Sequence, residues 1–212
     1  GKTRTGAEWI RDKVKSGARH IALVAANFTE ARAVMLHGKS GLLNIGHPSE
    51  RPRYIASRQR LEWPNGAVGQ IFSAEAPDGL RGSQFDAAWA DEFCAWNYAD
   101  ETLSNLRLAL RLETEDGQAP QMVVTTTPRP SPALIELKAA KGVVTHRLRT
   151  AENVHNLAEG FLETMEAQYG GSPLGQQELE GEIITEWPGA LWSLSTIAKT
   201  RENRAPDLDR IV

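Results

Sequence analysis

Four short apolar runs alternate along this chain with segments of helical periodicity. The runs cover residues 20–26, 85–90, 121–127 and 143–148, and each is shorter than a buried helix of ordinary length. Apolar strands that alternate with helices are typical of a parallel sheet with helices packed on both faces. We therefore predict an α/β fold with a mainly parallel sheet flanked by helices.

The helical segments show apolar stripes bounded by turn-forming residues. Ala7, Ile10 and Val14 form one stripe in a first helix that runs to Lys15. Further helices are expected over residues 29–35, 100–112, 133–140, 159–169 and 174–184, with a short one within 190–204. Residues 54–73 differ, because Pro64-Asn65-Gly66 lies between two short strand-like runs and predicts a hairpin.

The helical and strand patterns divide the chain into three parts. Residues 1–150 carry the alternating pattern and are predicted to form the core. Residues 151–189 are predicted to form a small helical subdomain, since residues 152–186 contain eight acidic residues and no Lys or Arg. Residues 190–212 resemble a linker, and residues 208–212 resemble the opening of a further strand.

Composition places the chain among ordinary globular proteins. The 212 residues are 41% apolar and 24% charged, with a formal net charge of −3. A single cysteine, Cys94, excludes an internal disulfide and favours a reducing compartment, so we expect the chain in the cytoplasm. Every apolar run falls short of the roughly 18 residues of a membrane-spanning helix, and no membrane partner is expected.

The first candidate for chemistry is Gly1-Lys2-Thr3, which leads directly into a helix. These residues match the end of a G-x-x-x-x-G-K-[ST] loop. In such a loop the helix N-terminus and the lysine bind phosphates, and the threonine hydroxyl binds Mg²⁺. Three residues alone are equally typical of a solvated helix start.

The second candidate is Asp91-Glu92, which follows the apolar run at 85–90. A carboxylate at the carboxyl end of a buried parallel strand faces the crevice where ligands bind. Asp91 is therefore a candidate for the metal shell and Glu92 for polarising the attacking water. The alternative is a pair of acids that cap the next loop.

The third candidate is Thr125-Thr126-Thr127, at the end of the next predicted strand. Hydroxyls at this position can hydrogen-bond the acids or a γ-phosphate, although β-branched residues are also common in strands for their shape alone. The order of the three motifs, Lys-Thr at a helix start, then Asp-Glu, then hydroxyls, is that of a P-loop ATPase. The predicted fold is accordingly a P-loop NTPase of RecA-like (ASCE) type.

The sequence resembles the ATPase domain of the terminase large subunit, the DNA-packaging motor of tailed bacteriophages, prophages and gene-transfer agents. The resemblance lies in five segments: GKTRTGAEW at 1–9, LVAANFTEARAVM at 23–35, GLRGSQFDAAWADEFCAW at 79–96, VVTTTPRP at 123–130 and GQQELEGEI at 175–183. It covers nearly the whole chain.

The resemblance implies a role for each motif residue. Gly1, Lys2 and Thr3 would bind the nucleotide, Thr3 and Asp91 would hold Mg²⁺, and Glu92 would be the catalytic base. Thr125, Thr126 and Thr127 would form the coupling motif that links hydrolysis of ATP to movement. Arg81 would be an arginine finger that acts in the site of a neighbouring subunit.

The resemblance also implies partners. These would be double-stranded DNA, a portal protein, a small terminase subunit and further copies of the chain in a ring on the capsid. Arg129, Arg58 and Arg60 are candidates for DNA contact, mostly with phosphates.

Two departures from the family pattern set further expectations. The strand and glycine-rich loop expected before Gly1 are absent, so we expect weak or no nucleotide binding by this chain alone. In this family a nuclease domain with acidic metal-binding residues follows the ATPase domain. The sequence contains no such carboxylate cluster after the strand-like residues 208–212, so we do not predict DNA cleavage by this chain.

Two alternatives remain open. A RecA-like helicase-type motor would share the three motifs but needs a second motor domain. A non-catalytic P-loop scaffold would keep the fold without turnover. The tryptophans at 9, 63, 89 and 96 fall on apolar patterns and are assigned to the core or to subunit contacts.

Overall fold

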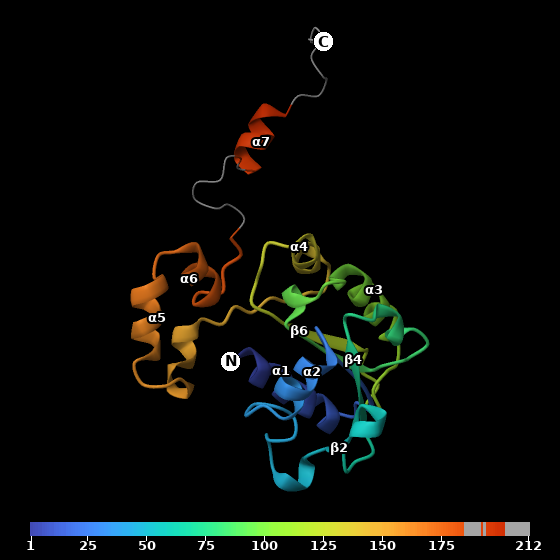
Figure 1. The fold of residues 1–212 in the computed structure, drawn as a ribbon. Helices are drawn as coiled ribbons and strands as arrows, with labels where there is room; N and C mark the ends of the chain where they lie inside the picture. The colour runs from blue at the N-terminus through green and yellow to red at the C-terminus, as the bar shows by residue number, and fades with distance from the viewer. Residues whose placement is uncertain (185–191, 193, 202–212) are drawn as a thin grey trace.

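The computed structural model describes residues 1–184, 192 and 194–201, and Figure 1 shows its ribbon. A six-stranded sheet lies at its centre, in the order β2-β3-β4-β1-β5-β6. The strands are β1 His20–Ala25, β2 Arg53–Ile55, β3 Arg60–Glu62, β4 Val68–Ser73, β5 Ala87–Asp91 and β6 Gln121–Thr125. Strands β4, β1, β5 and β6 run parallel, whereas β2 and β3 pair antiparallel. The predicted α/β fold is confirmed.

Helices accompany the sheet close to the predicted places, although the helix expected over 174–184 ends at Glu178. They are α1 Lys2–Lys15, α2 Phe28–Glu30, α3 Ala99–Ala109, α4 Pro132–Ala139, α5 Phe161–Tyr169, α6 Pro173–Glu178 and α7 Leu194–Thr200. A π-helical turn over Ala31–Leu36 continues α2, and short 3₁₀ turns cover Pro48–Glu50, Ala56–Arg58, Pro77–Leu80, Phe93–Ala95 and Thr150–Asn156.

The central strand β1 divides the core into two layers. Ile21 and Leu23 pack with α1 and the π-helical turn on one face of the sheet. Ala22 and Val24 pack with α3 and α4 on the other face. Alternate residues of a strand point to opposite faces, so this strand is apolar on both sides. Its continuous apolar run is explained by burial between two layers of helices.

The predicted hairpin is present between β3 and β4. The amide of Trp63 donates to the carbonyl of Ala67 at 2.9 Å, and Gly66 adopts a φ of +87° in the turn. Glycine tolerates this conformation because it lacks a Cβ. Strand β2 extends the hairpin by a third antiparallel strand.

The expectation of a strand at residues 143–148 is wrong. These residues form no strand, and the side chain of Val144 is 77% exposed. Strand β6 is the last strand of the sheet on this side, and a groove of about 1870 Å³ lies between β6, α1 and residues 140–183. The free edge of β6 could accept a further strand, but residues 143–148 line this groove instead and pair with none of the described strands. Their β-branched composition alone does not form a strand.

Helices α5 and α6 lie together beside the sheet, in orange in Figure 1. They contact each other and are drawn next to the turn over Thr150–Asn156. The boundary predicted at residue 150 stays a prediction. Most of the predicted linker at 190–212, including the strand-like residues 208–212, lies outside the described residues.

Gly6 sets the distance between α1 and the sheet. It is buried in the middle of the helix, and a Cβ at this position would lie 2.2 Å from Cε2 of Trp89. The helix therefore packs directly on the indole of β5.

Gly6→Ala is expected to destabilise the protein by about 1–3 kcal/mol, because the indole of Trp89 has no space to move away from the new methyl group. Helix propensity alone predicts the opposite sign, a gain of about 1 kcal/mol. Urea denaturation of the wild type and the variant measures the difference. Thr5→Ala, at the exposed neighbouring position, is the control; a Gly6→Ala variant more stable than the wild type would contradict the packing argument.

Candidate active site

Three elements meet at one edge of the sheet. They are the N-terminus of α1, the carboxyl end of β5 and the carboxyl end of β6. Parallel pairing sets Asp91 of β5 opposite Thr125 of β6. The three motifs predicted from the sequence therefore come together in space, at the edge where open α/β sheets bind ligands.

Asp91 is the buried acid of the site. Its side chain accepts a hydrogen bond from the hydroxyl of Thr125, with 2.6 Å between Oγ1 and Oδ1, and the residue is 3% exposed. Burial raises the pKa of Asp91 to about 6, against the lowering effect of the Thr125 hydrogen bond, and the nearby charge of Glu92 also raises it. A cation beside this carboxylate would offset the cost of burying its charge.

Glu92 adopts a left-handed backbone conformation, with a φ of +48°. Few residues other than glycine do so, and such strain is concentrated at functional sites. The amide of Thr127 donates to Oε2 of Glu92 at 3.2 Å, and Oε1 lies 3.8 Å from Nζ of Lys2. The side chain is 40% exposed, so Glu92 is held in place while water can still reach it.

Lys2 connects α1 to both strands. Its ammonium group donates to the hydroxyl of Thr127 at 2.7 Å and forms the ion pair with Glu92. The side chain is 39% exposed. Lys2 therefore lies where a phosphate could compete with Glu92 for its charge.

The three threonines contact three different partners. Thr125 donates to Asp91 and Thr127 accepts from Lys2. Thr126 accepts a hydrogen bond from the amide of Cys94 at 2.9 Å. The end of β6 is thus bound to the lysine, to the aspartate and to the turn that follows Glu92.

Two tryptophans complete the surroundings of Asp91. Nε1 of Trp89 donates to Oγ1 of Thr125 at 2.8 Å, and Nε1 of Trp96 donates to the backbone carbonyl of Asp91 at 2.9 Å. Their apolar sequence patterns predict only a place in the core or at a subunit contact, so these two hydrogen bonds were missed. The signal available was the two-residue spacing of Trp89 and Asp91, which places both side chains on one face of β5.

The N-terminus of α1 has the properties of an anion site. Gly1 is its N-cap, with no side-chain cap, and the first turn contains no acidic residue. Amide groups there keep the partial positive charge of the helix end. The hydroxyl of Thr3, in the first turn, makes no hydrogen bond with the described residues, so the structure leaves it available to a ligand.

The donor set suits a magnesium ion carried by phosphates. Among the described residues, no group of three or more His, Cys, Asp or Glu side chains could hold a metal ion. Mg²⁺ needs no such cluster, because it retains water and takes one or two protein oxygens together with substrate phosphates. Asp91 and Thr3 are residues of that kind.

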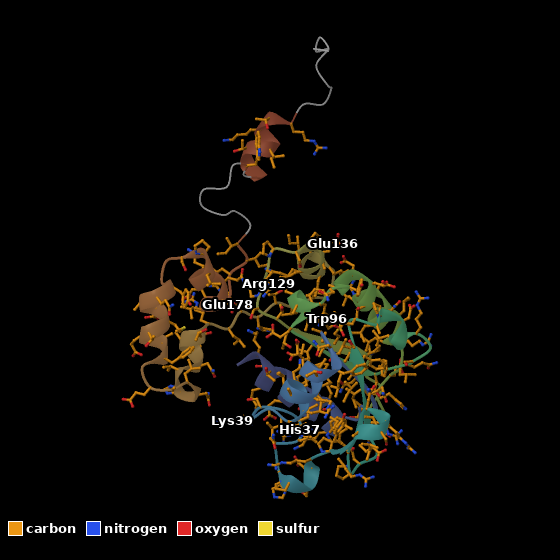
Figure 2. The ribbon with its side chains drawn as sticks, in the orientation of Figure 1. His37, Lys39, Trp96, Arg129, Glu136 and Glu178 are labelled. Carbon is orange, nitrogen blue, oxygen red and sulfur yellow. The ribbon has the colours of Figure 1, made fainter. Side chains whose placement is uncertain are left out.

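None of the predicted arginines forms a hydrogen bond or ion pair with Lys2, Asp91 or Glu92 among the described residues. Arg81 is exposed after the 3₁₀ turn Pro77–Leu80, and its Nε lies 2.8 Å from Oδ1 of Asp78. Arg60 is partly buried on β3 and pairs with Glu62. Arg58 and Arg129 are both exposed; Arg129 follows the threonines and is labelled in Figure 2.

The raised pKa of Asp91 predicts a pH dependence of stability. The unfolded carboxyl titrates near 3.8 and the folded one near 6, so the folded chain loses stability as the pH rises through this window, in total by about 3 kcal/mol. Asp91→Asn removes this loss. Urea denaturation in buffers without metal, from pH 4 to pH 7, measures the free energy of unfolding of both proteins. The value for Asp91→Asn should rise relative to that of the wild type as the pH rises. A difference in free energy of unfolding that stays constant over this range would contradict the prediction.

Comparisons with known proteins show what this chain is similar to. The family model described as terminase large subunit, T4likevirus-type, N-terminal, matches residues 1–199. A search of curated proteins finds no match.

Solved structures share the fold. The large terminase ATPase domain of Thermus phage P74-26 has a TM-score of 0.56 and 15% identity, over 87% of this chain and 84% of that chain. The large terminase of a thermophilic bacteriophage has a TM-score of 0.57 and 11% identity, over 85% of this chain and 44% of that chain. Because the family model covers residues 1–199 of 212, this chain belongs to the T4likevirus-type family of terminase large subunit N-terminal domains.

Proposed function

We propose that this chain is the ATPase motor domain of a terminase large subunit, which couples hydrolysis of ATP to translocation of double-stranded DNA into a procapsid. The observation that carries the proposal is the contact of Lys2 with both Glu92 and Thr127. The ammonium group of Lys2 thereby connects the candidate phosphate site with the candidate base and with the candidate coupling motif.

Nucleotide binding would fall to the start of α1. The uncapped helix end and Lys2 would bind the phosphates of ATP, with Gly1 close to them. Asp91 and the hydroxyl of Thr3 would hold Mg²⁺, which neutralises phosphate charge when bound.

Glu92 would act as the general base that polarises the attacking water. Its carboxylate is half-exposed and is held by the amide of Thr127 and by Lys2. If Lys2 turns toward a phosphate, Glu92 keeps the Thr127 amide as its partner and gains an oxygen for water. The same movement of Lys2 releases the hydroxyl of Thr127, which supports a role for the threonines in reporting the nucleotide state to the loop that carries Arg129.

The remaining partners follow from the family. Double-stranded DNA, a portal protein and a small terminase subunit would contact the large subunit in a homo-oligomeric ring on the capsid, in the cytoplasm of the bacterial host. Arg129, Arg58 and Arg60 are the proposed DNA contacts, although Arg60 would first have to leave Glu62. Among the described residues no helix is long and apolar enough to cross a membrane.

The helicase-type alternative requires a second motor domain to supply an arginine. Membership of the terminase family favours the packaging motor. The scaffold alternative differs from both in requiring no turnover, and substitution of Glu92 tests it directly.

Glu92→Gln is expected to lower the kcat of ATP hydrolysis by about 10²- to 10⁴-fold, because the amide cannot accept a proton from water. ATP affinity should stay close to that of the wild type. Phosphate release by the large subunit, with DNA present, measures the rate. Glu136→Gln, at an exposed glutamate of α4 labelled in Figure 2, is the matched control. Equal rates in the wild type and Glu92→Gln would favour the scaffold.

A mixing experiment tests whether Arg81 acts on a neighbouring subunit. Arg81→Ala and Glu92→Gln should each lose turnover when assembled alone. If Arg81 acts in trans, a mixed assembly contains sites with an intact Glu92 and an intact Arg81 from the neighbour, so turnover should return to about a quarter of the wild-type rate for random pairing. Mixtures that stay as inactive as either variant alone would exclude an arginine finger at this position.

A further inference from the structure

We propose that Trp89 and Trp96 are positioning residues that hold the Asp91–Glu92 pair in place for hydrolysis. Trp89 acts on the carboxylate of Asp91 through the hydroxyl of Thr125, and Trp96 acts on the backbone between the two acids. The inference rests on the proposed ATPase function, since it concerns the same site. Neither indole needs to touch ATP.

The contact from Trp89 gives the Thr125 hydroxyl a direction. An indole N–H can only donate, so at 2.8 Å it occupies a lone pair of Oγ1. The single hydroxyl hydrogen then has two acceptors in reach: Oδ1 of Asp91 at 2.6 Å and the carbonyl of Ala90 at 3.4 Å. The shorter contact is the stronger one, because its acceptor is a carboxylate. Donation from Trp89 polarises the hydroxyl and strengthens its bond to Asp91.

The contact from Trp96 fixes the peptide group between the acids. Its indole donates to the carbonyl of Asp91 at 2.9 Å, and that carbonyl belongs to the peptide that leads into Glu92. Because Glu92 has a φ of +48°, this peptide is held in an orientation that L-residues avoid. The hydrogen bond from Trp96 helps to offset the cost of that conformation, which is the one that directs Glu92 toward Lys2 and the Thr127 amide.

Both rings are held from several sides. Trp89 is fully buried between Gly6 of α1 and Thr125. Trp96, labelled in Figure 2, is 6% exposed and packs edge-on against Phe93, with 5.2 Å between ring centroids. The rings therefore act as fixed anchors for the acids.

A third buried tryptophan shows that these contacts are not a simple consequence of burial. Trp63 is 5% exposed in the same core layer as Trp89, yet its Nε1 has no hydrogen-bond partner among the described residues. The fold thus contains a buried indole N–H without a partner. Trp63 is the matched control for the other two.

The hydrogen bonds can be tested in the chain itself, without nucleotide. In ¹⁵N-labelled protein, the indole protons of Trp89 and Trp96, assigned by Trp→Phe substitution, should resonate downfield of that of Trp63. Thr125→Val should shift the Trp89 signal upfield and speed its exchange with water, whereas Thr125→Ser should leave it near its wild-type position. A Trp89 signal that does not respond to Thr125→Val would overturn the proposal.

The kinetic test compares three variants in the large subunit. Trp89→Phe and Trp96→Phe should each lower kcat by about 3- to 30-fold with the KM for ATP little changed, as expected for the loss of a hydrogen bond that orients a catalytic group. Trp63→Phe should retain the wild-type kcat. Thermal denaturation of all three checks folding, and equal kcat values in the three variants would reduce Trp89 and Trp96 to packing residues.

The two arms also separate this proposal from the proposed function. If the wild-type large subunit hydrolyses ATP but the Trp89 indole signal does not respond to Thr125→Val, only the positioning role fails. If the indole signals respond as expected but no ATP is hydrolysed, the ATPase function fails and the positioning role in hydrolysis fails with it.

Discussion

The hydrogen bond between Thr125 and Asp91 is the interaction on which the site depends. It joins neighbouring parallel strands at their carboxyl ends, and it exists because the β5–β6 register sets these two residues opposite each other. A shift of one residue would turn Asp91 to the other face, away from α1 and Lys2. Packing of Trp89 against Gly6 holds the register and the helix together, so the core and the site share one set of contacts.

The two acidic side chains of the site have one nearby cationic side chain among the described residues, that of Lys2. Asp91 is almost fully buried with a raised pKa, and Glu92 is half-exposed beside Lys2. A buried carboxylate is costly unless it is hydrogen-bonded or paired with a cation. The cost is met in part by Thr125, and the remainder favours a cation at this edge. The buried environment of Asp91 therefore lowers the stability of the folded chain and at the same time favours binding of a cation, a common property of functional sites.

Much of the arrangement could be predicted from the chain alone, for identifiable reasons. The strands at 87–91 and 121–125 are apolar and end in Asp-Glu and in hydroxyls, and parallel strands place their carboxyl ends together. The strand expected at 143–148 is absent because these residues line the groove beside β6 and do not pair with its free edge; whether a segment docks on a sheet edge depends on tertiary packing, which local composition cannot report. The contacts of Trp89 and Trp96 were missed because an indole in an apolar pattern looks the same with or without a partner for its N–H.

The sequence by itself determined the alternation of strands and helices, the order of the three motifs and the terminase resemblance, because periodicity and motif spacing are local properties. Only the tertiary structure decided that Lys2 pairs with Glu92 and Thr127 and that Glu92 is left-handed. It also decided that one indole donates to the Thr125 hydroxyl and another to the carbonyl of Asp91. These features depend on residues up to 125 positions apart. Side-chain contacts at such separations are set by sheet register and helix packing, which no local pattern encodes.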